Sequence, residues 1–151
     1  MRKILLIFCL LLAPARAQEE ITQLSYFNDQ FGNQASFWKV VVKGKTYVAL
    51  KLKSSDKTGE ATVVMDKPVF DEFEQKVGQL KAASNPLKTD GIQVFWSKDS
   101  GEARVSTMLG RWNGIKVKLI QVKENKLEHQ ITIDKSYGDF TRAVKKAKVV
   151  W

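Results

Sequence analysis

The chain offers little of the chemistry that depends on sulfur or imidazole. Its 151 residues include a single cysteine, Cys9, and a single histidine, His129. Cys9 lies in an apolar run at the N-terminus that we expect to be removed. The mature protein then forms no disulfide and offers no thiol for catalysis or for binding metals. One histidine is also too few for a transition-metal site of the usual kind, and we expect no cofactor.

Long apolar runs are lacking as well. A membrane-spanning helix needs about 20 apolar residues, and the run at residues 4–12 is much shorter. It follows Arg2 and Lys3 and precedes an Ala-x-Ala pattern that ends at Ala17. This order is typical of a secretory signal peptide. We therefore expect cleavage after Ala17 and a secreted or periplasmic protein without a transmembrane segment in the mature chain.

Acidic residues are scarce in the second half of the expected mature chain. Residues 18–90 contain ten basic and ten acidic side chains, whereas residues 91–151 contain twelve basic and six acidic ones. A positive field attracts anions. An anionic polymer, an envelope surface or an acidic protein is therefore the partner class to consider. A solvated surface with a cationic bias explains the same charge without any partner.

Apolar residues recur at every second position in several short segments, as in half-buried strands. In the first half these segments are residues 37–43, 46–53 and 61–65, with a weaker candidate at 23–28. For the segment at 37–43, we place Trp38 with Val40 toward the core and Phe37 outward. The second half predicts strands at 92–97, 103–109, 115–122 and 127–133, with a hairpin at Asn113-Gly114.

Each group of strands is followed by a segment with helical periodicity. Phe73 and Val77 belong to an apolar face that predicts a helix ending near residue 83, with Asp66 as its N-cap. Phe140 and Val144 belong to a second such face, which begins after Asp134. We expect Asp134 to cap this second helix in the same way.

The sequence therefore predicts an α+β protein in which a four-stranded antiparallel sheet followed by a helix occurs twice. The expected boundaries are a signal peptide at residues 1–17, a first repeat at 18–83, a linker at 84–90 and a basic second repeat at 91–151. This arrangement resembles the repeat of Pur-type and Whirly-type single-strand nucleic-acid-binding proteins. The resemblance implies that the helices cover one face of each sheet, and it raises nucleic acid as a partner. It rests on the order of the elements and carries over no residues.

Cations alternate with aromatic residues on the faces that we predict to point outward. The first repeat contributes Lys39, Tyr47 and Lys51, and the second contributes Phe95, Arg104, Lys116 and Lys118. Such a surface can hold anions and stack against rings. We therefore predict a non-enzymatic binding or interaction domain whose basic sheet face, around Arg104, Lys116 and Lys118, meets an anionic partner. Ordinary solvent-facing lysines, or a homodimer formed through the sheet faces, are the alternatives.

Two further alternatives come from single features. His129 is in phase with Leu127, Ile131 and Ile133, which indicates a structural histidine, but a secreted hydrolase that uses His129 as its general base is the rival hypothesis. The basic helix that ends in Val149, Val150 and Trp151 suits either packing on its own sheet or a membrane surface.

Overall fold

The computed structural model describes residues 20–81, 91–95, 102–112 and 115–151, without the side chains of 91–95, 102, 109, 111–112 and 115–116. The predicted signal peptide, the predicted linker and the Asn113-Gly114 hairpin turn lie outside the described residues.

Two antiparallel sheets and two helices make up the described chain. Sheet 1 has the order β1 (Glu20–Asn28), β2 (Gln34–Val42), β3 (Lys45–Lys53) and β4 (Ala61–Met65). Sheet 2 has the order β5 (Gly91–Phe95), β6 (Glu102–Trp112), β7 (Ile115–Glu124) and β8 (Leu127–Thr132). Helix α2 (Lys67–Leu80) follows β4, and α3 (Tyr137–Lys148) follows β8. The predicted α+β class is confirmed, and β4 has the predicted bounds.

Local chemistry explains the sharpest turn of sheet 1. Lys43 and Gly44 both have positive φ, 51° and 74°. Two consecutive residues of this kind form the turn that matches the twist of a two-residue hairpin. The turn fixes the β2–β3 register, in which Val42 pairs with Lys45 and Trp38 pairs with Ala49.

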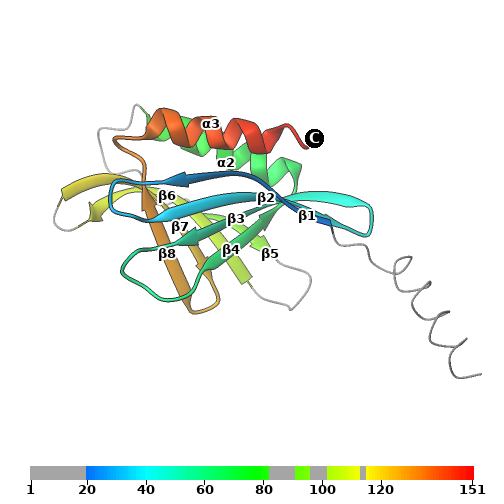
Figure 1. Ribbon diagram of the computed structural model, residues 1–151, viewed down its shortest axis with the longest axis horizontal. Helices are drawn as coiled ribbons and strands as arrows, with labels where there is room; N and C mark the ends of the chain where they lie inside the picture. The colour runs from blue at the N-terminus through cyan, green and yellow to red at the C-terminus, as the bar shows by residue number, and fades with distance from the viewer. Residues whose placement is uncertain (1–19, 82–90, 96–101, 113–114) are drawn as a thin grey trace, which may run out of the picture.

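The helices lie side by side and each contacts the sheet of the other half of the chain (Figure 1). Helix α3 packs on β1 and β2, where the centre of the Phe140 ring lies 5.3 Å from the centre of the Phe27 ring and 6.0 Å from that of the Phe37 ring. Helix α2 packs on β5 and β6, and also on β3 and β4. The Tyr137 hydroxyl donates to the Val77 carbonyl (3.0 Å) and joins the two helices. Both halves therefore contribute to one core.

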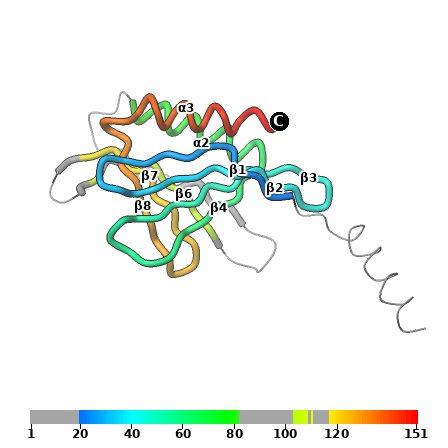
Figure 2. Tube along the Cα trace, viewed as in Figure 1, coloured from blue at the N-terminus to red at the C-terminus, as the bar shows by residue number. Residues whose placement is uncertain are grey.

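This core determines which side of β2 is buried. Phe37 is fully buried between Phe73 and Phe140, so the predicted phase of this strand is wrong. Trp38 instead lies on the face of sheet 1 opposite the helices. Figure 2 follows the same chain path, with β1 and β2 below the two helices.

The two helices begin differently. The Asp66 carboxylate accepts the backbone N–H of Val69 at 3.1 Å, which confirms Asp66 as the N-cap of α2. Asp134 is not the N-cap of α3, because Ser136 occupies that position. The Asp134 carboxylate instead accepts the backbone N–H of Lys118 in β7. It therefore joins the α3 entry to sheet 2.

Strand β7 is buried on both faces. Ile120 and Val122 belong to the main core, while Val117 and Leu119 form a small second cluster with Met108 and Phe31. Phe31 lies in the β1–β2 connection, so this connection covers part of the outer face of sheet 2. The adjacent apolar residues Leu119 and Ile120 therefore reflect burial on both faces of β7, and the β7 pairing stays in register on both sides.

Candidate binding face

The face of sheet 1 that points away from the helices is the candidate site. Strand alternation and register place on it the side chains that share a face with Trp38. We call this surface the aromatic face and define it by Gln23, Tyr26, Asn28, Gln34, Ser36, Trp38, Tyr47, Lys51, Lys53 and Thr62. Tyr47 and Lys51 therefore lie where the sequence predicted them.

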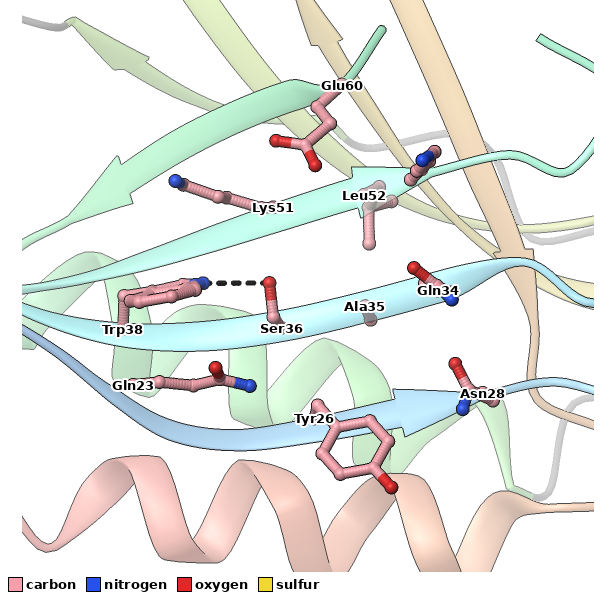
Figure 3. Close-up of a pocket in the computed structure, with 11 residues that line it drawn as sticks. Gln23, Tyr26, Asn28, Gln34, Ala35, Ser36, Trp38, Lys51, Leu52 and Glu60 are labelled. Carbon is pink, nitrogen blue, oxygen red and sulfur yellow. Dashed lines mark hydrogen bonds between the residues drawn. The ribbon is translucent and has the colours of Figure 1, made fainter. Parts of the chain in front are cut away.

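Trp38 is held in a defined orientation on this face. Its indole N–H donates to the Ser36 hydroxyl oxygen at 2.8 Å, as Figure 3 shows. The Lys51 ammonium lies 4.8 Å from the centre of the Trp38 rings, within cation–π range. This ordered pair combines a fixed aromatic ring with a positive charge.

Three aromatic residues form a diagonal row across β1, β2 and β3. The register places Tyr26 opposite Ser36, Trp38 opposite Ala49 and Tyr47 opposite Val40. Each step therefore crosses one strand and advances two residues along it, a spacing of roughly 7–8 Å. Tyr26 is 67% exposed, and the Lys45 ammonium lies 5.3 Å from the Tyr47 ring centre.

A shallow pocket lies beside Trp38 and Tyr26 (Figure 3). Its lining combines both rings with carboxamides, a hydroxyl, lysines and a carboxylate, from Gln23, Asn28, Gln34, Ser36, Lys51, Lys53 and Glu60. In the part of the chain that the structure describes, Lys51 and Lys53 form no ion pair with a carboxylate. These two cations are therefore available to an anionic group.

The remaining predicted site residues do not gather on one face. Lys39 shares the face of Phe37, not that of Trp38, and its ammonium pairs with Glu20 at 3.5 Å. Arg104 is exposed on sheet 2, where it pairs in register with Lys123. Lys118 lies on the opposite face of sheet 2 from Arg104.

The position of Lys118 corrects the predicted patch around Arg104, Lys116 and Lys118. Lys118 shares its face with the buried Ile120, and its ammonium donates to the Lys81 carbonyl (2.9 Å) at the end of α2. Lys118 therefore supplies a hydrogen-bond donor to a carbonyl at the C-terminal end of α2. Lys116 lies in β7 and Phe95 in β5, and their side chains fall outside the described part of the chain.

His129 is a buried residue between the two sheets. It is 1% exposed, and its Nδ1 accepts the backbone N–H of Ser54 at 3.0 Å. Burial lowers the pKa of His129 below 6.5, and nearby Lys57 lowers the pKa further. A neutral, buried imidazole whose Nδ1 already accepts a hydrogen bond fits the structural interpretation. Nothing in this geometry presents His129 to a substrate.

A second polar cluster joins the sheets, and the sequence did not reveal it. The buried Asp29 carboxylate accepts the backbone N–H groups of Phe31 (2.8 Å), Asn33 (2.9 Å) and Thr132 (2.8 Å). The Asn33 side-chain oxygen accepts the backbone N–H of Ser55 at 2.8 Å. The clustered turn residues at 28–33 were the only available signal. This cluster supports the edge of the aromatic face where β1 ends and β2 begins.

The end of the chain packs on the protein. The Trp151 ring lies 5.2 Å from the Phe70 ring, and its indole N–H donates to the Thr46 carbonyl at 3.4 Å. Phe140, Ala143, Val144 and Ala147 of α3 are buried. The apolar face of α3 is thus used within the fold.

Within the described residues, no helix has the length and apolar character needed to cross a membrane. No group of three or more potential metal-binding side chains occurs among them either.

The chain matches no known protein family, and no curated protein shows significant similarity to it.

Proposed function

We propose that this chain is an exported, non-enzymatic binding domain that holds an anionic partner on the aromatic face. The observation that carries the proposal is the ordered Trp38–Lys51 pair on a sheet face that the helices leave uncovered. Charge attracts the partner over about a Debye length, roughly 10 Å at 0.1 M salt, and the rings then add short-range contact.

Charge removal at matched positions tests the proposal. One variant replaces Lys45, Lys51 and Lys53 by Gln, and a control variant replaces Lys135, Lys145 and Lys146, which are exposed around α3, by Gln. Both lose the same net charge. We expect only the first variant to lose retention on an anionic matrix at low salt. Equal loss in both variants means that net charge alone governs retention, and it refutes a site on the aromatic face.

Export is the second part of the proposal. It rests on the order of a basic start, a short apolar run and the Ala-x-Ala pattern before Gln18. N-terminal sequencing of the native protein checks it. A mature chain that begins at Gln18 supports export, whereas a chain recovered with Met1 or Arg2 at its start contradicts it.

Single-strand nucleic acid is the second candidate partner, favoured by the diagonal row of Tyr26, Trp38 and Tyr47. Aromatic side chains spaced across a sheet can stack successive bases.

We also propose that the two halves arose by duplication. In support, the equivalent helix positions Phe73 and Phe140 both contact Phe37. Failure of the two halves to superpose, strand on strand and helix on helix, would contradict that origin.

A further inference from the structure

We infer that the partner of the aromatic face is an acidic polysaccharide, a chain of sugar rings that carry carboxylates and free hydroxyls. The inference rests on the proposed function and names its ligand class. It depends on the mixture of polar groups that surround the aromatic row.

The pocket beside Trp38 offers more hydrogen-bond acceptors than a purely cationic site would. The carboxamides of Gln23, Asn28 and Gln34 each donate and accept. Sugar hydroxyls also donate and accept, so the two sets are complementary. Phosphate groups only accept, and they would leave the carboxamide oxygens without donors.

Glu60 is the group that best discriminates between anionic ligands. Its exposed carboxylate lines the pocket together with Lys51 and Lys53, and Figure 3 places it across β3 from Ser36. A carboxylate at this position repels any anionic group, sugar carboxylates included, but it also accepts hydrogen bonds from hydroxyls, which offset the repulsion for a sugar chain and not for a polyphosphate. The lysines beside it supply the charge that a sugar carboxylate requires.

The aromatic residues complete the match. Tyr26 is exposed, so its ring presents apolar surface to the C–H face of a sugar ring, and Trp38 lies beside it in a fixed orientation with the Lys51 ammonium over its ring. The row from Tyr26 through Trp38 to Tyr47 spans roughly 15 Å, twice the diagonal spacing in a sheet. A linear chain can lie along this row with its carboxylates toward Lys45 and Lys51.

The test compares four probes with the full mature protein: polygalacturonate, its methyl ester, polyglutamate and an oligothymidylate. The ester keeps the rings and ring hydroxyls but loses the charge, whereas polyglutamate keeps the charge but loses the rings. We expect polygalacturonate to bind most tightly. Trp38→Ala should weaken that binding roughly tenfold, which corresponds to the loss of about 1.4 kcal/mol.

Glu60→Ala distinguishes the ligand classes by the sign of its effect. We expect it to weaken polygalacturonate binding several-fold and to strengthen binding of polyglutamate and oligothymidylate. If Glu60→Ala strengthens binding of every anion, or if polyglutamate or oligothymidylate binds as tightly as polygalacturonate, the polysaccharide inference fails while anion binding stands. If no anionic probe binds, the proposed function fails as well. Thermal unfolding of each variant confirms that the fold is retained.

Discussion

Replacing Asp29 by Ala should destabilise the protein more than any surface change. The Asp29 carboxylate accepts five hydrogen bonds, from Phe31, Asn33 and Thr132. The backbone N–H groups of Asn33 and Thr132 are buried, and in the variant they lose this acceptor. Each buried donor without a partner costs about 1–3 kcal/mol. We expect the free energy of unfolding to fall by about 3–5 kcal/mol in total.

Urea denaturation followed by far-UV circular dichroism measures this loss. Asp139→Ala is the matched control, because Asp139 is an exposed carboxylate that pairs with Arg142 on α3, and such pairs contribute about 0–1 kcal/mol. A second variant, Asp29→Asn, keeps the shape of the side chain but replaces one acceptor oxygen by an NH₂ group. This group faces N–H and O–H donors and cannot accept from them, so the variant should also be less stable than the native protein. If the free energy of unfolding of Asp29→Ala lies within about 0.5 kcal/mol of the native value, the cluster does not join the sheets as described.

Three further predictions concern the core and its polar contacts. Burial lowers the pKa of His129, so the folded protein binds a proton at His129 less readily than the unfolded chain. The neutral His129 therefore contributes its full stability above pH 6.5, and this stability is lost as the pH falls through the folded-state pKa. His129→Asn, whose side-chain oxygen can accept the Ser54 N–H, should flatten this part of a stability–pH profile, and an unchanged slope would assign it to other groups. Phe140→Ala should cost about 3–5 kcal/mol in urea titrations, whereas Val149→Ala, at a position 81% exposed, should change the midpoint little; equal effects contradict the helix packing. Asp66→Ala should cost about 1 kcal/mol through loss of the helix cap, and Asp134→Ala should leave the helix content of α3 unchanged by circular dichroism.

The alternation of apolar and polar residues was enough to predict the buried face of a strand wherever one face is wholly apolar. In β3 and β4, Leu50, Leu52 and Val63 are buried as predicted. In β2 both faces carry apolar residues, so the local pattern could not decide between Phe37 and Trp38. The decision comes from Phe73 and Phe140, which reach Phe37 from helices in different halves of the chain.

The predicted basic patch on sheet 2 was wrong for a similar reason. The sequence places Lys116 and Lys118 on the outward face of β7, but that face carries the buried core residues Ile120 and Val122, and Phe31 covers Val117 and Leu119 on the opposite face. Lys118 then shares the face of Ile120 and reaches the end of α2. The candidate site on sheet 1 was found in part, because Tyr47 and Lys51 alternate cleanly with buried neighbours. Trp38 was missed, although Gln34 and Ser36 on the same side of the strand indicated an outer face.

Because each helix packs on the sheet of the other half, the core of this protein cannot form fully until α3 has been synthesised. The strands β1 and β2 leave the ribosome well before the residues that cover them, including Phe140 and Ala143, are made. Until then Phe27 and Phe37 lack the Phe140 ring, although Phe73 can already contact Phe37, so part of this apolar surface stays accessible to water and to chaperones. A nascent chain stopped before residue 137 therefore presents an apolar sheet that quality-control factors can recognise, whereas the finished chain hides it.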